Sequence, residues 1–156
     1  MNSKKYSLLK SLSCIDISTY YKSISLYKRV QARRAIFERY AQALEEIDGI
    51  HFMPKLEGTM SNRWLTALTI DQKILGVKPI DIINALAHEN IEARPVWKPL
   101  HLQPLFEGTR YYSHEEGWSV SDELFANGLC LPSGSSMTIE EQQRVIDVIM
   151  HVLKQS

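Results

Sequence analysis

The sequence predicts an α+β fold in which a small sheet of about three to four strands has helices packed on it. Three observations lead to this prediction. Apolar residues recur at helical steps in three segments, whereas short apolar runs between turn residues have the length of strands. The segments follow one another in the order helix, strand, strand, helix, strand, strand, helix. With 156 residues, the chain is expected to form one domain around one core.

The first clear helical pattern starts at about Tyr21 and ends at Asp48-Gly49, because glycine tolerates the left-handed conformation that closes a helix. Basic residues occupy much of the outer surface of this helix. Three glutamates accompany them, so a solvated helix face is a better interpretation than a nucleic-acid contact. The shared apolar face consists of Ile24, Tyr27, Val30, Phe37, Tyr40, Leu44 and Ile47.

Two strands are expected after this helix, over residues 50–53 and 64–70. The second has apolar residues at successive positions without strict alternation, so we expect both of its faces to be covered. A second helix is expected over residues 78–88, with Pro79 in the first turn, where a missing N–H group costs nothing.

The second half of the chain contains two further extended segments and a last helix. Residues 91–97 are extended, and Pro95 either confines them to a sheet edge or ends their pairing. A short strand is expected over residues 129–131. Thr138 and Glu141 form a capping box for the last helix. The apolar stripe of that helix consists of Val145, Ile146, Ile149, Val152 and Leu153.

Charge and cysteine content exclude several classes of protein. Lysine plus arginine and aspartate plus glutamate both number 18, so the net charge is zero. A nucleic-acid-binding protein usually has a strong basic excess, whereas zero net charge permits self-association. Cys14 and Cys130 are too few for a disulfide framework or a four-cysteine zinc site, which favours a cytoplasmic setting. No apolar run is long enough to span a membrane.

The strongest candidate site is the segment from Arg94 to His101. It contains two cations, Arg94 and Lys98, together with the indole of Trp97 and the imidazole of His101. Two prolines stiffen the backbone between them. Such a group can bind a phosphate or a sugar. A purely structural alternative is favoured on spacing alone. In this alternative, an edge strand leaves the sheet, Trp97 is a core residue and the charged side chains are solvated.

Other patterns indicate structure more than chemistry. Residues 133–136 resemble an anion-binding turn, but a connector with good turn chemistry is the better interpretation. Cys130 stands between leucines and is expected to be a core thiol. The irregular stretch at 98–120 is rich in polar and aromatic residues, which is typical of a functional loop. No motif by itself identifies a reaction.

Several segments together resemble one known family. Residues 91–104 read I-E-A-R-P-V-W-K-P-L-H-L-Q-P, and residues 61–66 read S-N-R-W-L-T. Residues 119–121 and 128–134 read S-V-S and G-L-C-L-P-S-G. In order and spacing, these segments resemble the C-terminal part of the DegT/DnrJ/StrS family of pyridoxal-phosphate sugar aminotransferases. The best match is to members that act on nucleotide-linked 4-keto N-acetyl sugars.

The resemblance implies that residues 26–156 form the small domain of a fold-type-I aminotransferase, and that residues 1–25 are an unmatched tail. The family's large N-terminal domain supplies the Schiff-base lysine, and no lysine of this chain stands in such a context. The phosphate-binding G-x-N-x-R-M segment of the family has no match near Leu9 to Ser13. The chain alone is therefore expected to bind no pyridoxal phosphate, although the complete family enzyme contains it.

The resemblance also implies a role for each candidate residue. Arg94, Trp97, Lys98 and His101 are expected to line the entrance for a nucleotide-linked sugar. The two cations would bind the diphosphate, and His101 would bind the sugar or a neighbouring polar group. These are positioning roles, so no catalytic, cofactor-binding or metal-binding residue is expected in the chain.

Two classes of function stay open. The chain is either the substrate-side domain of a cytoplasmic enzyme of polysaccharide biosynthesis, which is expected to be inactive by itself, or it has another role. That alternative is a free-standing binding or assembly module, or a remnant of a truncated or split gene that associates with a partner chain. Its partner is expected to be a large domain or a second copy, not nucleic acid or a membrane. Uncovered apolar surface is expected at Leu105, Phe106, Tyr111, Tyr112 and Trp118.

Overall fold

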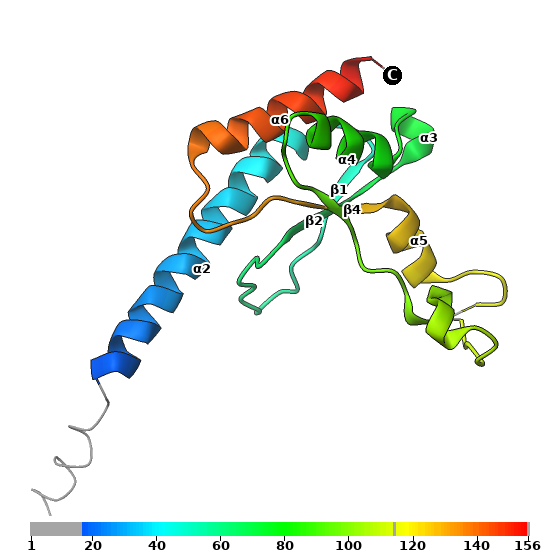
Figure 1. The fold of residues 1–156 in the computed structure, drawn as a ribbon, viewed down its shortest axis with the longest axis horizontal. Helices are drawn as coiled ribbons and strands as arrows, with labels where there is room; N and C mark the ends of the chain where they lie inside the picture. The colour runs from blue at the N-terminus through cyan, green and yellow to red at the C-terminus, as the bar shows by residue number, and fades with distance from the viewer. Residues whose placement is uncertain (1–16, 114, 156) are drawn as a thin grey trace, which may run out of the picture.

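A four-stranded antiparallel sheet lies at the centre of the molecule, with helices on both sides (Figure 1). The computed structural model describes residues 17–113 and 115–155. The helices are α2 (Ile17–Leu44), α3 (Gln72–Leu75), α4 (Pro79–His88), η1 (Leu100–Leu102), η2 (Pro104–Phe106), α5 (Val120–Asn127) and α6 (Ile139–Lys154). The strands are β1 (Ile50–Phe52), β2 (Thr66–Ile70), β3 (Arg94–Pro95) and β4 (Gly128–Leu131). The predicted α+β class is confirmed.

The strands are ordered β1-β2-β4-β3, so that β2 and β4 are central. Thr66 pairs with Leu131, and Arg94 pairs with Cys130. The strand that contains Pro95 is an edge strand, as predicted, because proline has no N–H group for a second neighbour. Pairing in this strand is restricted to two residues, so most of the expected extended segment 91–97 is irregular.

The two faces of the sheet differ in burial. Along β2, Thr66, Leu68 and Ile70 are buried, whereas Ala67 and Thr69 between them are only half-buried. The expectation that this strand is covered on both faces is wrong. The run of successive apolar residues includes Trp64, which precedes the strand, and the strand itself alternates with a period of two.

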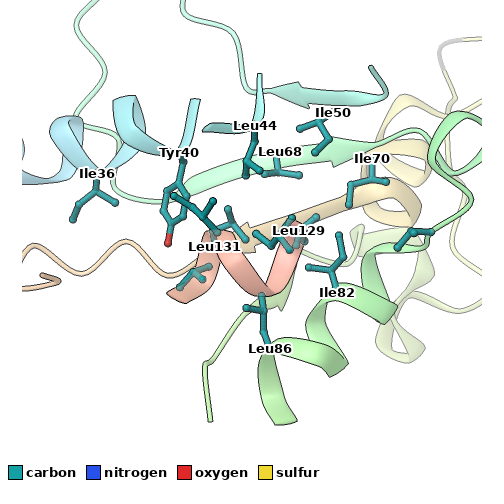
Figure 2. Packing of buried hydrophobic residues seen from close by; sticks show 14 residues of the cluster. Ile36, Tyr40, Leu44, Ile50, Leu68, Ile70, Ile82, Leu86, Leu129 and Leu131 are labelled. Atoms are coloured by element: carbon teal, nitrogen blue, oxygen red, sulfur yellow. The ribbon is translucent and has the colours of Figure 1, made fainter. Parts of the chain in front are cut away.

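The buried face of the sheet carries α2, α4 and α6, and this layer holds the hydrophobic core. Figure 2 shows the side chains of the helices converging on those of the strands. The helices contribute Ile36, Tyr40, Leu44, Ile82, Leu86, Val145, Ile146 and Ile149. The strands contribute Ile50, Leu68, Ile70, Leu129 and Leu131. On the opposite face, α5 packs against β2 and β4.

A buried glutamine joins α6 to α2 within the core. The Nε2 of Gln142 donates a hydrogen bond to the carbonyl oxygen of Ile36 at 2.7 Å. Its Oε1 accepts one from Nε of Arg39 at 2.6 Å. The hydroxyl of Tyr40 donates to the carbonyl oxygen of Pro132 at 3.1 Å, and burial raises the pKa of Tyr40 well above its usual range. These polar groups are satisfied, so their burial is tolerated.

The ends of the long helices agree with the sequence analysis to within a few residues. The first helix begins earlier than expected, at Ile17, and ends at Leu44, after which a turn leads to Gly49 in the left-handed region with φ of 91°. In the last helix, the capping box of Thr138 and Glu141 is confirmed, with hydrogen bonds of 2.8 and 3.1 Å.

Two short helices were not predicted, α3 and α5. Each begins at a side-chain cap. Asp71 accepts a hydrogen bond from the backbone N–H of Lys73, and Ser119 accepts one from that of Asp122. Neither helix has enough periodic apolar positions to show in the sequence pattern.

The expected boundary between residues 25 and 26 falls within the continuous α2. The assignment of residues 1–25 as an unmatched tail stays a prediction, and Cys14 lies outside the described residues. Among the helices of residues 17–113 and 115–155, none combines the length and the apolar run that are needed to cross a bilayer.

The packing of the core predicts that substitution of two leucines by alanine changes the free energy of unfolding by different amounts. Leu86 is fully buried on α4, whereas Leu56 is 78% exposed in the loop after β1. We expect Leu86→Ala to lower the free energy of unfolding by about 2–5 kcal/mol, because it removes buried methyl groups and leaves a cavity. Leu56→Ala serves as the matched control and is expected to change it by less than about 0.5 kcal/mol. Urea denaturation followed by circular dichroism measures both values, and equal losses would contradict this account of the core.

Candidate functional site

A largely apolar cavity of about 680 Å³ lies on the less covered face of the sheet. The strands β1 and β2 form its floor, the segment after β3 forms one wall, and α5 forms another. The floor includes His51, Ala67 and Thr69, and the walls include Trp97, Lys98, Leu100, Ser121 and Leu124. A concave apolar surface with a few polar groups at its margin is typical of a ligand site.

Trp97 stands at the rim of this cavity and is 68% exposed. Its ring lies 6.2 Å from that of Trp64, at an interplanar angle of 37°. The alternative in which Trp97 is a core residue is therefore wrong. Val96 takes the inward position instead, so close to Gly128 that a Cβ atom on this glycine would lie 2.8 Å from the valine side chain.

The two candidate cations lie on different sides of Trp97. Lys98 lines the apolar cavity, whereas Arg94 lines a second cavity of about 540 Å³ at the edge of the sheet. Trp97 lines both cavities. The guanidinium of Arg94 pairs with Glu92, with Nε 2.6 Å from Oε1, and both side chains are exposed. An exposed ion pair of this kind contributes little to stability and leaves Arg94 available to a ligand.

His101 lines neither of these two cavities. Its side chain is only 15% exposed, and its Nε2 lies 2.7 Å from Oδ1 of Asp122. The imidazole also stacks on the ring of Tyr111, with centroids 3.6 Å apart and an interplanar angle of 14°. The structure therefore brings Trp97 and Lys98 together at one cavity and places His101 in a separate cluster. Its role as a sugar contact stays a prediction that no contact in this structure supports.

Sequence reasoning missed Asp122 and Tyr111 as the neighbours of His101. A signal for Asp122 was present, because Ser119 stands three residues before it, in the spacing of a helix N-cap. That pattern would have placed Asp122 in the first turn of a helix. No local pattern indicates that Tyr111 stacks on a histidine ten residues earlier.

Four of the five residues expected to form an exposed apolar surface are exposed, including Tyr111 and Trp118. Leu105 and Tyr112 are strongly exposed, whereas Phe106 is half-buried. Tyr111 stacks on His101, and Nε1 of Trp118 donates a hydrogen bond to Glu123 at 3.1 Å. Other exposed apolar side chains, among them Trp97 and Leu100, line the apolar cavity.

The serines after β4 serve as structural connectors. Ser133 is buried, and its hydroxyl accepts a hydrogen bond from the backbone N–H of Thr66 at 2.9 Å. The same hydroxyl donates to the carbonyl oxygen of Leu131 at 2.9 Å. The following helix starts only at Ile139, so residues 133–136 are not its N-terminus.

Cys130 is a buried thiol of the sheet, as expected, and burial raises its pKa. Within residues 17–113 and 115–155, there is no group of three or more histidine, cysteine, aspartate or glutamate side chains arranged to hold a metal ion.

Two solved structures of sugar aminotransferase relatives share this fold. A DegT DnrJ EryC1 StrS aminotransferase from Brucella abortus is 26% identical and superimposes with a TM-score of 0.61 over 78% of this chain and 30% of its own. PseC from Helicobacter pylori, an aminotransferase involved in the biosynthesis of pseudoaminic acid, is 15% identical, with a TM-score of 0.67 over 81% of this chain and 33% of its own.

Curated relatives match the same part of the chain. A Bacillus subtilis protein, EpsN, whose name describes a pyridoxal phosphate-dependent aminotransferase, is 56% identical over 127 residues, which are 81% of this chain and 32% of EpsN. GDP-perosamine synthase of Vibrio cholerae is 25% identical over 122 residues, which are 78% of this chain and 32% of that enzyme. The chain thus spans about a third of the length of the curated relatives it matches. The model of the DegT/DnrJ/EryC1/StrS aminotransferase family matches residues 24–150, and the chain belongs to this family.

Proposed function

We propose that this chain is the C-terminal, substrate-side domain of a pyridoxal phosphate-dependent aminotransferase that acts on nucleotide-linked keto sugars. One observation carries the proposal. Three helices, α2, α4 and α6, cover one face of the sheet, whereas the other face, on which α5 packs, presents an apolar cavity with Trp97 and Lys98 on its wall. A catalytic large domain would cover that face and close the site. The match to only 32% of two relatives supports this arrangement.

The chemistry of the cavity wall fits a nucleoside diphosphate sugar. An exposed indole offers a flat apolar surface on which a base or a sugar ring can stack. Lys98 supplies a positive charge for a phosphate group next to that indole, and Arg94 supplies a second charge on the other side of it. The names of two similar proteins support this substrate class. One is GDP-perosamine synthase, and the other is DesI, whose structure was determined in the presence of its TDP-sugar product.

The described residues do not fit a covalent pyridoxal phosphate site. Such a site needs a lysine held inside a cofactor cradle, whereas each described lysine side chain between residues 24 and 155 is exposed. The two lysines at cavity walls, Lys73 and Lys98, are among these exposed side chains. In the complete enzyme, the cofactor supplies the electron sink for amino transfer. The part of this chain is to bind the nucleotide sugar and to hold it in place.

A second candidate function is self-assembly as a binding module. The chain has no net charge, and Leu105, Leu100 and Trp97 expose large apolar side chains. Both features favour association between copies, because charge repulsion is weak and burial of apolar surface is favourable.

A chimera with the Bacillus subtilis relative tests the proposed function. We expect the chain alone to give no pyridoxal phosphate adduct on borohydride reduction, because no described lysine is suitably buried. When it replaces the matched segment of EpsN, we expect glutamate-dependent amino transfer to a nucleotide-linked 4-keto sugar. In that chimera, Trp97→Ala should raise KM more than it lowers kcat. A chimera that folds, binds the cofactor and fails to turn over would contradict the proposal.

A direct binding experiment tests the cavity wall. Titration of the 15N-labelled chain with UDP-N-acetylglucosamine is expected to shift the signals of Trp97 and Lys98 with millimolar affinity, about 4 kcal/mol. Trp97→Ala and Lys98→Ala should each weaken binding, and added salt should also weaken it, because exposed charges are screened. The matched control is Lys154→Ala, an exposed lysine at the end of α6. Shifts that cluster away from the cavity would rule out this site.

Light scattering tests self-association. We expect the apparent mass to rise with protein concentration, and the double substitution L100S/L105S to reduce that rise, because it removes two exposed apolar side chains. A constant monomer mass at high concentration for the unsubstituted chain would rule out self-assembly. The role as an aminotransferase domain would then be the remaining proposed function.

A further inference from the structure

The wall of the apolar cavity that carries Trp97 and Lys98 is a short span between two anchors. The first anchor is Val96, whose backbone N–H donates to the carbonyl oxygen of Gly128 at 3.3 Å and whose side chain contacts this glycine. The second anchor is His101, which is held by Asp122 and Tyr111. Between these anchors lie only four residues, 97–100, and all four line the cavity.

The second anchor joins two walls of the same cavity. His101 follows the wall that contains Trp97, Lys98 and Leu100, whereas Asp122 belongs to the first turn of α5. The neighbours of Asp122 on that helix, Ser121 and Leu124, also line the cavity. The contact between Nε2 of His101 and Oδ1 of Asp122, at 2.7 Å, therefore joins the two segments that supply these walls.

The facing atoms of this contact are sheltered. Both are buried, and neither forms a hydrogen bond with a described residue, so each has the other, at 2.7 Å, as its close polar neighbour in an ion-pair contact. A buried polar atom that loses its neighbour is left desolvated, which is costly. The shielding applies to the two facing atoms, because the Asp122 side chain as a whole is 41% exposed.

Tyr111 extends the cluster along the loop. Its ring stacks on the imidazole, and its hydroxyl lies 2.8 Å from Oγ of Ser119, the residue that caps α5. Oγ of Ser119 also accepts a hydrogen bond from the backbone N–H of Asp122 at 3.3 Å. The loop is thus attached to the start of α5 at two separate points.

We propose that His101 is a positioning residue that sets the width of the apolar cavity by clamping the Trp97–Leu100 wall to α5 through Asp122. This inference rests on the proposed function, because it assigns the recognition of a nucleotide-linked sugar to Trp97 and Lys98. It removes His101 from direct contact with that ligand. A cavity of fixed width selects a sugar by its shape. The clamp keeps that width fixed because it makes the cavity wall rigid.

Hydrogen exchange on the full chain tests the clamp. In η1 and η2, the amides of Leu102, Gln103 and Phe106 donate to backbone carbonyls at 2.9–3.1 Å and report on the loop. We expect His101→Leu to accelerate their exchange about tenfold relative to core amides of β2. His101→Gln keeps a donor for Asp122 and should restore most of the protection. The matched control is His88→Leu, an exposed histidine of α4, which should leave the loop unchanged.

A double-mutant cycle with Asp122→Asn separates the contact from other effects of this carboxylate, such as its position in the first turn of α5. We expect the effect of Asp122→Asn on loop exchange to disappear in the His101→Leu background. Additive effects, failure of the glutamine variant to restore protection, or an equal acceleration across the core would each overturn the proposal.

Titration with UDP-N-acetylglucosamine distinguishes a clamp from a ligand contact. We expect His101→Leu and Asp122→Asn to raise the dissociation constant by similar factors, several-fold each, because both release the same wall. An effect of His101→Leu alone, without faster loop exchange, would place His101 on the ligand and overturn the clamp. If the unsubstituted chain does not bind this probe, the proposed substrate class fails, and the exchange cycle still decides whether the clamp exists.

Discussion

The antiparallel pairing of β2 with β4 is the constraint on which the rest of the structure depends. It places Leu68 opposite Leu129 and Thr66 opposite Leu131, so that one face of the sheet is lined by large apolar side chains. The same register places Ala67 opposite Cys130 and Thr69 opposite Gly128 on the other face. Because side chains alternate along a strand, a shift of one residue would exchange the two faces. The buried helical layer on one face and the open cavity on the other therefore both follow from the register of β2 and β4.

The size of the residues on the open face explains why a cavity forms there. Alanine, threonine and glycine leave room above the strands that leucine would fill. On the central strand β4, Gly128 admits the side chain of Val96, and the next residue, Trp97, is exposed at the rim. A small residue on one strand thus decides which aromatic residue of a neighbouring segment is available to a ligand.

Polar groups in this domain divide into two kinds of role. Gln142 and Ser133 are buried and hydrogen-bonded. Gln142 connects α6 to α2, and Ser133 connects the segment after β4 to the start of β2. Arg94 and Lys98 are exposed beside cavities. His101 belongs structurally with the first kind, although its place in the sequence suggests the second. Titratable residues close together in sequence do not share one function when an edge strand and a tight turn orient them differently.

Local periodicity, capping and motif order were enough to predict the class of fold, the two long helices, the edge position of Pro95 and the family. Trp97 and Lys98 could also be predicted as candidates for one site, since adjacent residues stay adjacent in the fold. The open face of β2, the position of Arg94 at a different cavity and the contact of His101 with Asp122 became known from the three-dimensional arrangement. Each of these depends on strand register or on a contact between residues some 20 or more positions apart, and the patterns within a short segment carry no information on such contacts.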